Sequence, residues 1–144
     1  MKHRLAAALC ASLLLASCAS APQPADYAAE LPRLDLRRYF DGPLQAHGVF
    51  TDRAGRVQRR FTVRLQGRWD GDMGVLEEDF DYSDGQKQRR VWHLKALGQG
   101  RYEGRADDVV GVARGEAAGN ALRWTYTLKL AVDGKVYEVD FEDW

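Results

Sequence analysis

The stretch Asn120–Val132, NALRWTYTLKLAV, alternates apolar and polar residues from Leu122 onward. Successive side chains of a β-strand point to opposite faces, so this alternation predicts a strand with one face in a core and the other in water. The core face carries Leu122, Trp124, Tyr126, Leu128 and Leu130. We expect the other strands of the chain to supply packing partners for this face.

Similar alternating stretches, joined by short turn sequences, fill the chain after Pro43. Proline removes a donor from the hydrogen-bond ladder, so its absence beyond this position permits an unbroken sheet. Together with the stretch above, the alternation predicts about eight strands. The others are Leu44–Asp52, Arg56–Trp69, Met73–Tyr82, Gln86–Ala96, Arg101–Ala106, Asp107–Ala117 and a last strand after Asp133-Gly134.

The turn sequences predict how the strands pair. A two-residue turn at Asp70-Gly71 places Leu65 opposite Leu76 inside and Arg64 opposite Glu77 outside. Apolar residues then meet apolar ones and cations meet anions, which stabilises a sheet by about 0.2–1 kcal/mol per pair. We therefore interpret the acidic run from Glu77 to Asp81 as a charge-paired outer face.

Three further pairings follow from the same reasoning. A three-residue turn over residues 83–85 places Arg90 opposite Glu78, and a turn at Asp133-Gly134 places Tyr126 opposite Phe141. Pairing of Tyr102 with Leu94 would leave the space beside Gly104 for the large ring of Trp92. The inward face of Asp107–Ala117 stays open, and a bulge near Asp108 would explain this ambiguity.

The predicted fold class is all-β: an antiparallel up-and-down meander that closes into a lipocalin-like barrel over residues 34–144. Closure would remove the two exposed edges of an open sheet, and a barrel of this size is filled by side chains or holds one small ligand. A β-sandwich is the alternative. Leu34–Phe40 is expected to form either a short helical turn or an arm packed on the domain.

The N-terminus predicts export and lipidation. A basic head and the short apolar run Leu5–Leu15 are typical of a secretory signal peptide over residues 1–17. Leu15-Ala16-Ser17-Cys18 resembles the lipobox of bacterial lipoproteins, in which the cysteine, here Cys18, becomes acylated, for instance with palmitate. Cleavage after Ala21 is the alternative.

Residues 18–33 would then be the acylated cysteine and a flexible tether. Ala19 after the cysteine suggests sorting to the outer membrane, with the domain in the periplasm. The other cysteine, Cys10, precedes Cys18, so the predicted domain contains no disulfide.

Several motifs resemble a proteobacterial lipoprotein family known as domain of unknown function 3833. They are Tyr39–Gly42, Asp52–Arg56, Glu78–Gly85, Gly119–Leu122 and Asp143-Trp144. The resemblance extends over most of residues 35–144 and implies one domain with a lipid anchor. It implies no activity, because no catalytic residues are assigned to the family.

Charged residues on predicted inward faces are the candidate site. Arg59, Glu78, Arg90 and Asp108 are the members of this set. A buried unpaired charge is costly, so an internal ion pair between Glu78 and Arg90 is the simplest interpretation. Alternatively, Arg59 or Arg90 holds the carboxylate or phosphate of a ligand at the polar end of a cavity. Trp92, Trp124 and Tyr126 would line such a cavity or simply fill the core.

The sequence offers little for catalysis, metal binding or nucleic acid. Its serines after Cys18 are Ser20 and Ser83, and His47 and His93 lie on predicted outer faces without metal-ligand spacing. The full chain has 21 basic and 21 acidic residues, and removal of residues 1–17 takes away two basic ones. A nucleic-acid binder would show a basic stripe instead. We expect no enzyme, cofactor, metal site or nucleic-acid partner.

Two functions fit these expectations. The first is a membrane-anchored binding module for a small amphipathic or lipid-like molecule. The alternative is a structural or interaction protein of the cell envelope, with a filled barrel and no ligand.

Overall fold

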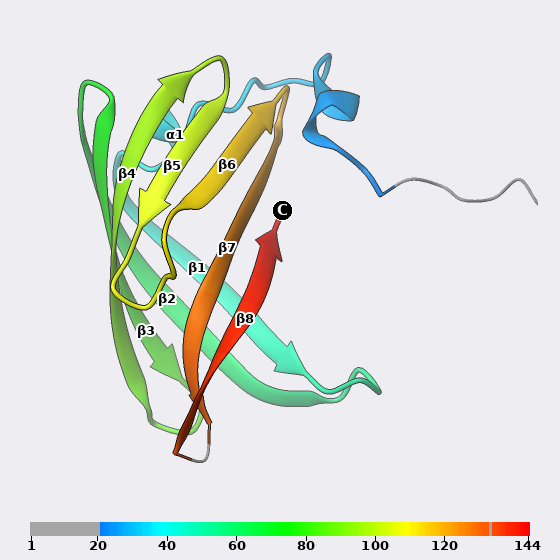
Figure 1. The fold of residues 1–144 in the computed structure, drawn as a ribbon, viewed down its shortest axis with the longest axis vertical. Coiled ribbons are helices and arrows are strands. Elements are labelled where there is room, and N and C mark those ends of the chain that lie inside the picture. Colours follow the sequence, from blue (N-terminus) through cyan, green and yellow to red (C-terminus); the bar gives the residue numbers. More distant parts are fainter. Residues whose placement is uncertain (1–20, 133) are drawn as a thin grey trace, which may run out of the picture.

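The computed structural model describes residues 21–132 and 134–144, which form one antiparallel sheet with short helical turns before it (Figure 1). Each strand pairs with the next one along the chain, in the order β1 to β8. The strands are β1 Gly42–Thr51, β2 Val57–Asp70, β3 Met73–Tyr82, β4 Lys87–Gly98, β5 Arg101–Arg105, β6 Ala113–Ala118, β7 Ala121–Val132 and β8 Lys135–Asp143. The predicted all-β antiparallel meander of eight strands is confirmed.

The sheet curls into a half-barrel, so that β7 and β8 face β1 and β2 across an interior (Figure 1). In the part of the chain that the structure describes, no strand pairs with the outer edge of β1 or of β8. These two edges therefore stay open where a fully closed barrel would join them. A single sheet also distinguishes the fold from the alternative, a β-sandwich.

The pairing of β2 with β3 differs from the prediction by two residues. Asp70 pairs with Met73, so the turn is Gly71-Asp72 and Leu65 lies opposite Glu78. Gly71 has a φ of 58°, which suits the first central position of a type II′ turn. A shift of two residues keeps every side chain on its face, and the predicted inward and outward residues are therefore unchanged.

The other two hairpins pair as predicted. Glu78 lies opposite Arg90 on β3 and β4, and Tyr126 lies opposite Phe141 on β7 and β8. Both turns contain a glycine with positive φ at the expected place, Gly85 and Gly134. Strand alternation and turn chemistry were thus sufficient to predict the register here.

The region from β4 to β6 departs most from the prediction. Leu94 pairs with Gly104 rather than with Tyr102, because a bulge near Gly98 lengthens β4 before its turn. The rings of Trp92 and Trp124 both crowd the face of Gly104, where a Cβ atom would lie 3.1 Å from Trp92. The absence of a side chain at Gly104 therefore leaves space for both tryptophan rings.

Residues 106–112 form a loop instead of the predicted continuous strand. The loop lies along β7: Val110 N donates to the carbonyl of Thr127, and Lys129 N donates to the carbonyl of Asp108, both at 2.9 Å. Only Val109 forms an isolated bridge, with Leu128. Contacts with β7 satisfy some of the backbone groups that a strand would have paired, and the loop brings the Asp108 side chain beside Arg90.

One end of the half-barrel is closed by the segment before β1. Leu36 begins the single-turn helix α1 (Leu36–Tyr39), and its side chain is 2% exposed within the core. Asp35 caps the helix by accepting a hydrogen bond from Arg37 N. Both interpretations of Leu34–Phe40 therefore hold, since the segment is a helical turn and also packs on the domain.

Residues 21–33, expected to be part of a flexible tether, lie against the sheet. The 3-10 helix η2 (Pro24–Tyr27) buries Pro24, and its contacts are with β6 and β7. Leu34 N donates to the carbonyl of Gly119, and the ring of Tyr27 meets that of Trp144 edge-on at 6.3 Å. Cys18, the predicted signal peptide and the start of the tether lie outside the described residues. None of the described helices is long and apolar enough to cross a membrane.

Candidate functional site

The interior of the half-barrel contains a cavity of about 610 Å³. All six residues proposed from the sequence line it: Arg59, Glu78, Arg90, Trp92, Trp124 and Tyr126. They come from β2, β3, β4 and β7, and the curl of the sheet brings them together. Most of the remaining lining is apolar, from Leu36 at the closed end to Phe50 and Phe61 on β1 and β2.

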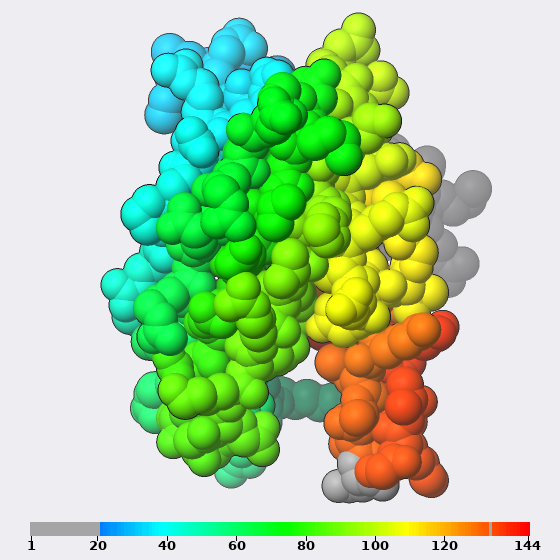
Figure 2. Space-filling model, turned by 90° about the vertical axis from the view of Figure 1, so that its left-hand side faces the viewer, coloured from blue at the N-terminus to red at the C-terminus, as the bar shows by residue number. Residues whose placement is uncertain are grey.

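The shortness of β5 and β6 leaves a gap in one wall. β5 pairs only with residues 93–98 of β4, and β6 pairs only with residues 121–125 of β7. Figure 2 shows a gap below them, between the β3–β4 hairpin and the β7–β8 hairpin. The interior therefore opens sideways as well as between β1 and β8.

Aromatic rings form much of the cavity wall. The indole of Trp92 meets the rings of Trp124 and Tyr126 edge-on, with centroids 5.8 and 5.6 Å away. Tyr126 stacks in turn on Phe141 at 5.4 Å. These contacts hold the rings at fixed angles along the cavity wall, and the guanidinium of Arg90 lies 5.9 Å over the centroid of the Trp92 ring.

Arg90 is held by Asp108 rather than by Glu78. Its Nε and Nη2 donate to the Asp108 carboxylate at distances of 2.7–3.1 Å. The nearest approach to Glu78 is 3.9 Å, at the limit of an ion pair. The predicted pair of Glu78 and Arg90 therefore lies in register, but the charge of Arg90 is neutralised mainly by the loop residue.

Among the described residues, Glu78 has only a distant cationic partner in the cavity. Its side chain is 13% exposed, and burial raises the pKa of its carboxyl group to about 7. The guanidinium of Arg90 opposes this rise in pKa, whereas the carboxylates of Asp108 and Asp143 add to it. Near neutral pH this carboxyl group therefore exchanges between its charged and neutral forms.

Asp143 is a site residue that the sequence analysis did not single out. It lies opposite Trp124 at the end of β8, and its Oδ2 accepts a hydrogen bond of 2.9 Å from the Tyr126 hydroxyl. Burial and the nearby carboxylate raise the pKa of Tyr126, which keeps the hydroxyl as a donor. The alternation through Tyr137, Val139 and Phe141 was the signal that could have placed Asp143 inside.

Arg59 lies at the far end of the cavity from α1, beside the turn between β3 and β4. Its Nη2 donates to Asp84 at 3.0 Å and to Gln86 at 2.9 Å. Its Nε lies 2.8 Å from Asp84, out of line for a hydrogen bond, and its guanidinium stacks 3.6 Å above the Tyr82 ring. Arg59 is thus also engaged by residues of the protein.

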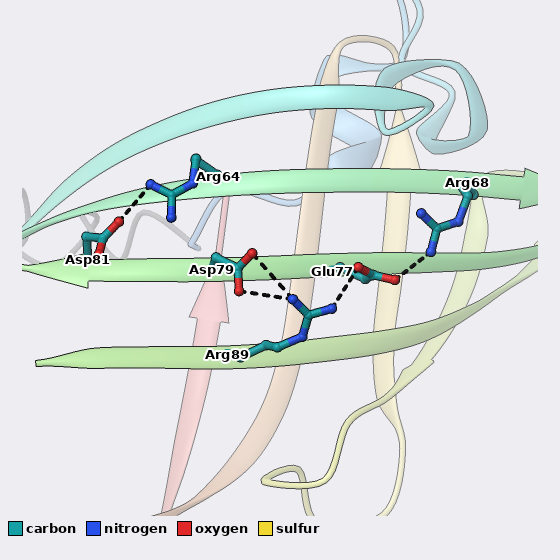
Figure 3. Close-up of polar contacts among 6 residues, drawn as sticks. All are labelled: Arg64, Arg68, Glu77, Asp79, Asp81 and Arg89. Atoms are coloured by element: carbon teal, nitrogen blue, oxygen red, sulfur yellow. Dashed lines mark hydrogen bonds and ion pairs between the residues drawn. The ribbon is translucent and has the colours of Figure 1, made fainter.

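The outer face of the same strands carries a ladder of exposed ion pairs (Figure 3). Arg89 bridges Glu77 and Asp79, and Arg68 pairs with Glu77. This confirms the prediction of a charge-paired outer face, although the partners differ because the β2–β3 register differs: Arg64 pairs with Asp81. Among residues 21–132 and 134–144, no group of His, Cys, Asp and Glu is arranged to hold a metal ion.

Fold and site together define a single-sheet half-barrel with a mostly apolar cavity and a few half-buried or exposed charged residues along its lining. The protein-family model described as "Protein of unknown function (DUF3833)" matches residues 12–144, so the chain belongs to this family. No curated protein and no solved structure matches the chain.

Proposed function

We propose that the protein is a binding module that holds a small amphipathic molecule in its half-barrel. The cavity of about 610 Å³ carries this proposal, because small-molecule sites are concave, mostly apolar and contain a few polar groups. Its wall is built from aromatic and aliphatic side chains, and its charged groups are few: Arg59, Glu78, Arg90 and Asp143. An apolar tail would lie against the rings and a polar group near the charges.

We also propose that residues 1–17 are removed and that the acylated Cys18 anchors the domain to the outer membrane from the periplasmic side. The six residue-to-residue steps from Cys18 to Pro24 span at most about 22 Å, so an anchor would hold the η2 end of the half-barrel near the membrane. Stable anchoring needs more than one acyl chain. Metabolic labelling with an alkyne analogue of palmitate tests the modification: Cys18→Ser should abolish labelling and release the protein from membranes.

Ligand binding is tested with the full-length Cys18→Ser variant, purified from periplasmic extract without detergent. Native mass spectrometry should detect copurified amphiphiles, and added amphiphiles should change the fluorescence of Trp92 and Trp124. Ala46 lines the cavity, so Ala46→Trp should weaken binding. The control is Ala54→Trp in the exposed β1–β2 turn. A protein that neither carries nor binds any amphiphile would contradict the proposal.

A structural or interaction protein of the envelope is the second candidate. Among the residues that the structure describes, no strand pairs with the outer edges of β1 and β8, which supports this candidate because an exposed strand edge can pair with a strand of another protein. Tyr39 and Trp144, which are 57% and 53% exposed, offer apolar contacts near the α1 end. Site-specific photo-crosslinking from β8 in cells tests this function, and the absence of any specific crosslinked partner would exclude it.

A further inference from the structure

We propose that the cavity selects an apolar molecule whose polar group is a cationic nitrogen, with Glu78 and Asp143 as its counterions and the rings of Trp92 and Tyr126 beside it. This inference rests on the proposed binding function and names the class of ligand. It reverses the expectation that Arg59 or Arg90 would hold a carboxylate or phosphate. Three observations support it: both arginines are already paired with acids of the protein, Glu78 and Asp143 have no cation of their own among the described residues, and aromatic rings line the cavity.

The two cations of the cavity are already neutralised. Arg90 donates three hydrogen bonds to Asp108, so a ligand carboxylate would have to displace that aspartate. Arg59 is paired with Asp84 and hydrogen-bonded to Gln86. Removal of one partner from a buried pair leaves an uncompensated charge, which makes such a displacement costly.

The two acids are not neutralised in the same way. Glu78 has Arg90 only at 3.9 Å, and Asp108 already occupies that guanidinium. Asp143 accepts a hydrogen bond from the neutral hydroxyl of Tyr126, and within the described residues it has no ion pair. Two carboxyl groups thus line the cavity without a dedicated cation, so the lining attracts a positive charge.

The aromatic wall favours the same class of ligand. The negative face of an aromatic ring attracts a cation within about 6 Å of its centroid, and cages of aromatic rings are a common site for quaternary ammonium groups. Trp92 and Tyr126 lie 5.6 Å apart, and Tyr126 stacks on Phe141. Tyr126 also carries the hydroxyl that contacts Asp143, so rings and acids are parts of one cluster.

The proton on Glu78 adds a dependence on pH. The charged groups that act on it are Arg90 from β4, Asp108 from the β5–β6 loop and Asp143 from β8, and its neighbour on β2 is the apolar Leu65. Since its pKa is about 7, a cationic ligand binds more tightly as the pH rises and Glu78 ionises. An anionic ligand would show the opposite dependence.

The test compares three probes with the same alkyl chain, each below its micellar concentration: dodecyltrimethylammonium, dodecanoate and dodecanol. Binding to the full-length Cys18→Ser variant is measured by tryptophan fluorescence and calorimetry. At pH about 8 we expect the ammonium probe to bind roughly tenfold or more tightly than dodecanoate, with a smaller ratio at pH about 6. Equal or tighter binding of dodecanoate would overturn this inference and leave the proposed function intact. If no probe binds, or if Ala46→Trp changes none of the affinities, the binding function itself fails.

Two variants distinguish selection by charge from simple burial of the chain. Glu78→Gln should reduce the preference for ammonium about fivefold and remove its pH dependence. The control is Glu77→Gln, the adjacent residue on the outer face, which should change neither. Asp108→Asn frees Arg90 and should shift the preference toward dodecanoate. Circular dichroism checks that each variant is folded. If Glu78→Gln prefers the ammonium probe as strongly as the protein with Glu78 does, the proposal is contradicted.

Discussion

The guanidinium of Arg90 donates three hydrogen bonds to the carboxylate of Asp108, which lies 18 residues further along the chain. This contact fastens the β5–β6 loop to β4 at the gap that the short strands leave. Arg90 is only 13% exposed, so the pair lies partly inside the cavity wall. The same contact stabilises the wall and determines which charges remain available to a ligand.

Loss of the Asp108 carboxylate should destabilise the fold. Asp108→Ala leaves Arg90 half-buried and poorly paired, and we expect the free energy of unfolding to fall by about 2–4 kcal/mol. Urea denaturation gives this value. Glu103→Ala removes the partner of the exposed Arg114 and is the control, with an expected loss below about 1 kcal/mol. Equal effects of the two changes would show that the Arg90 pair contributes no more than a surface ion pair.

Glu78 should make stability depend on pH between about 4.5 and 7. Its pKa is raised from 4.5 to about 7 in the folded protein, so the folded state binds more protons than the unfolded state over this range. Stability therefore falls as the pH rises, by about 3 kcal/mol at most. Acids whose pKa is lowered, such as Glu77 and Asp81, change stability only at lower pH.

The measurement is urea denaturation, at several pH values, of the protein with Glu78 and of the Glu78→Gln variant. The variant should lose most of this dependence and become the more stable protein at the alkaline end. Glu77→Gln should keep the full dependence, because its carboxylate lies on the outer face. If the free energy of unfolding of Glu78→Gln depends on pH as strongly as before, a group other than Glu78 causes the dependence.

Leu36 should be essential for closing one end of the half-barrel. Its side chain is 2% exposed and belongs to the core, although it precedes every strand. Truncation of a buried leucine to alanine costs about 2–5 kcal/mol. Thermal denaturation of Leu36→Ala tests this, with Leu31→Ala, at a leucine that is 72% exposed, as the matched control. Similar melting temperatures for both variants would mean that α1 is dispensable for the core.

The outer ladder of ion pairs should contribute little at ordinary ionic strength. Arg89 pairs with Glu77 and Asp79, but its side chain is more than half exposed. Exposed pairs are worth about 0–1 kcal/mol each and weaken with salt. Arg89→Ala should therefore lower the free energy of unfolding by about 1 kcal/mol or less, with a smaller loss in high salt. A larger, salt-independent loss would show that packing of the arginine stem matters more than its charge.

Most of the sheet could be predicted from local patterns. Alternation of apolar and polar residues assigned faces correctly even where a pairing was wrong: the β2–β3 turn is displaced by one residue, yet Leu76 and Phe80 still point inward and Glu77 outward. The reason is the two-residue period of a strand, which makes the face insensitive to a shift of two in register.

The candidate site could be predicted only in part. Arg59, Glu78 and Arg90 were placed on the interior because each lies on a strand with a clear period. The partner of Arg90 could not be chosen, since Asp108 reaches it from an irregular loop whose backbone bonds are to β7. Asp143 had the right spacing but no local feature that marked it as functional.

The sequence alone therefore determined most of the strands and the faces of their residues, because these depend on neighbours within a few residues; the β2–β3 turn and the loop before β6 differ from what it predicts. Only the tertiary structure decided that the described strands leave the sheet open between β1 and β8, that Leu36 closes one end, and that Asp108 rather than Glu78 neutralises Arg90. Those outcomes depend on how far the sheet curls and on contacts between residues far apart in the chain. The alternation of apolar and polar residues along the sequence does not predict such contacts.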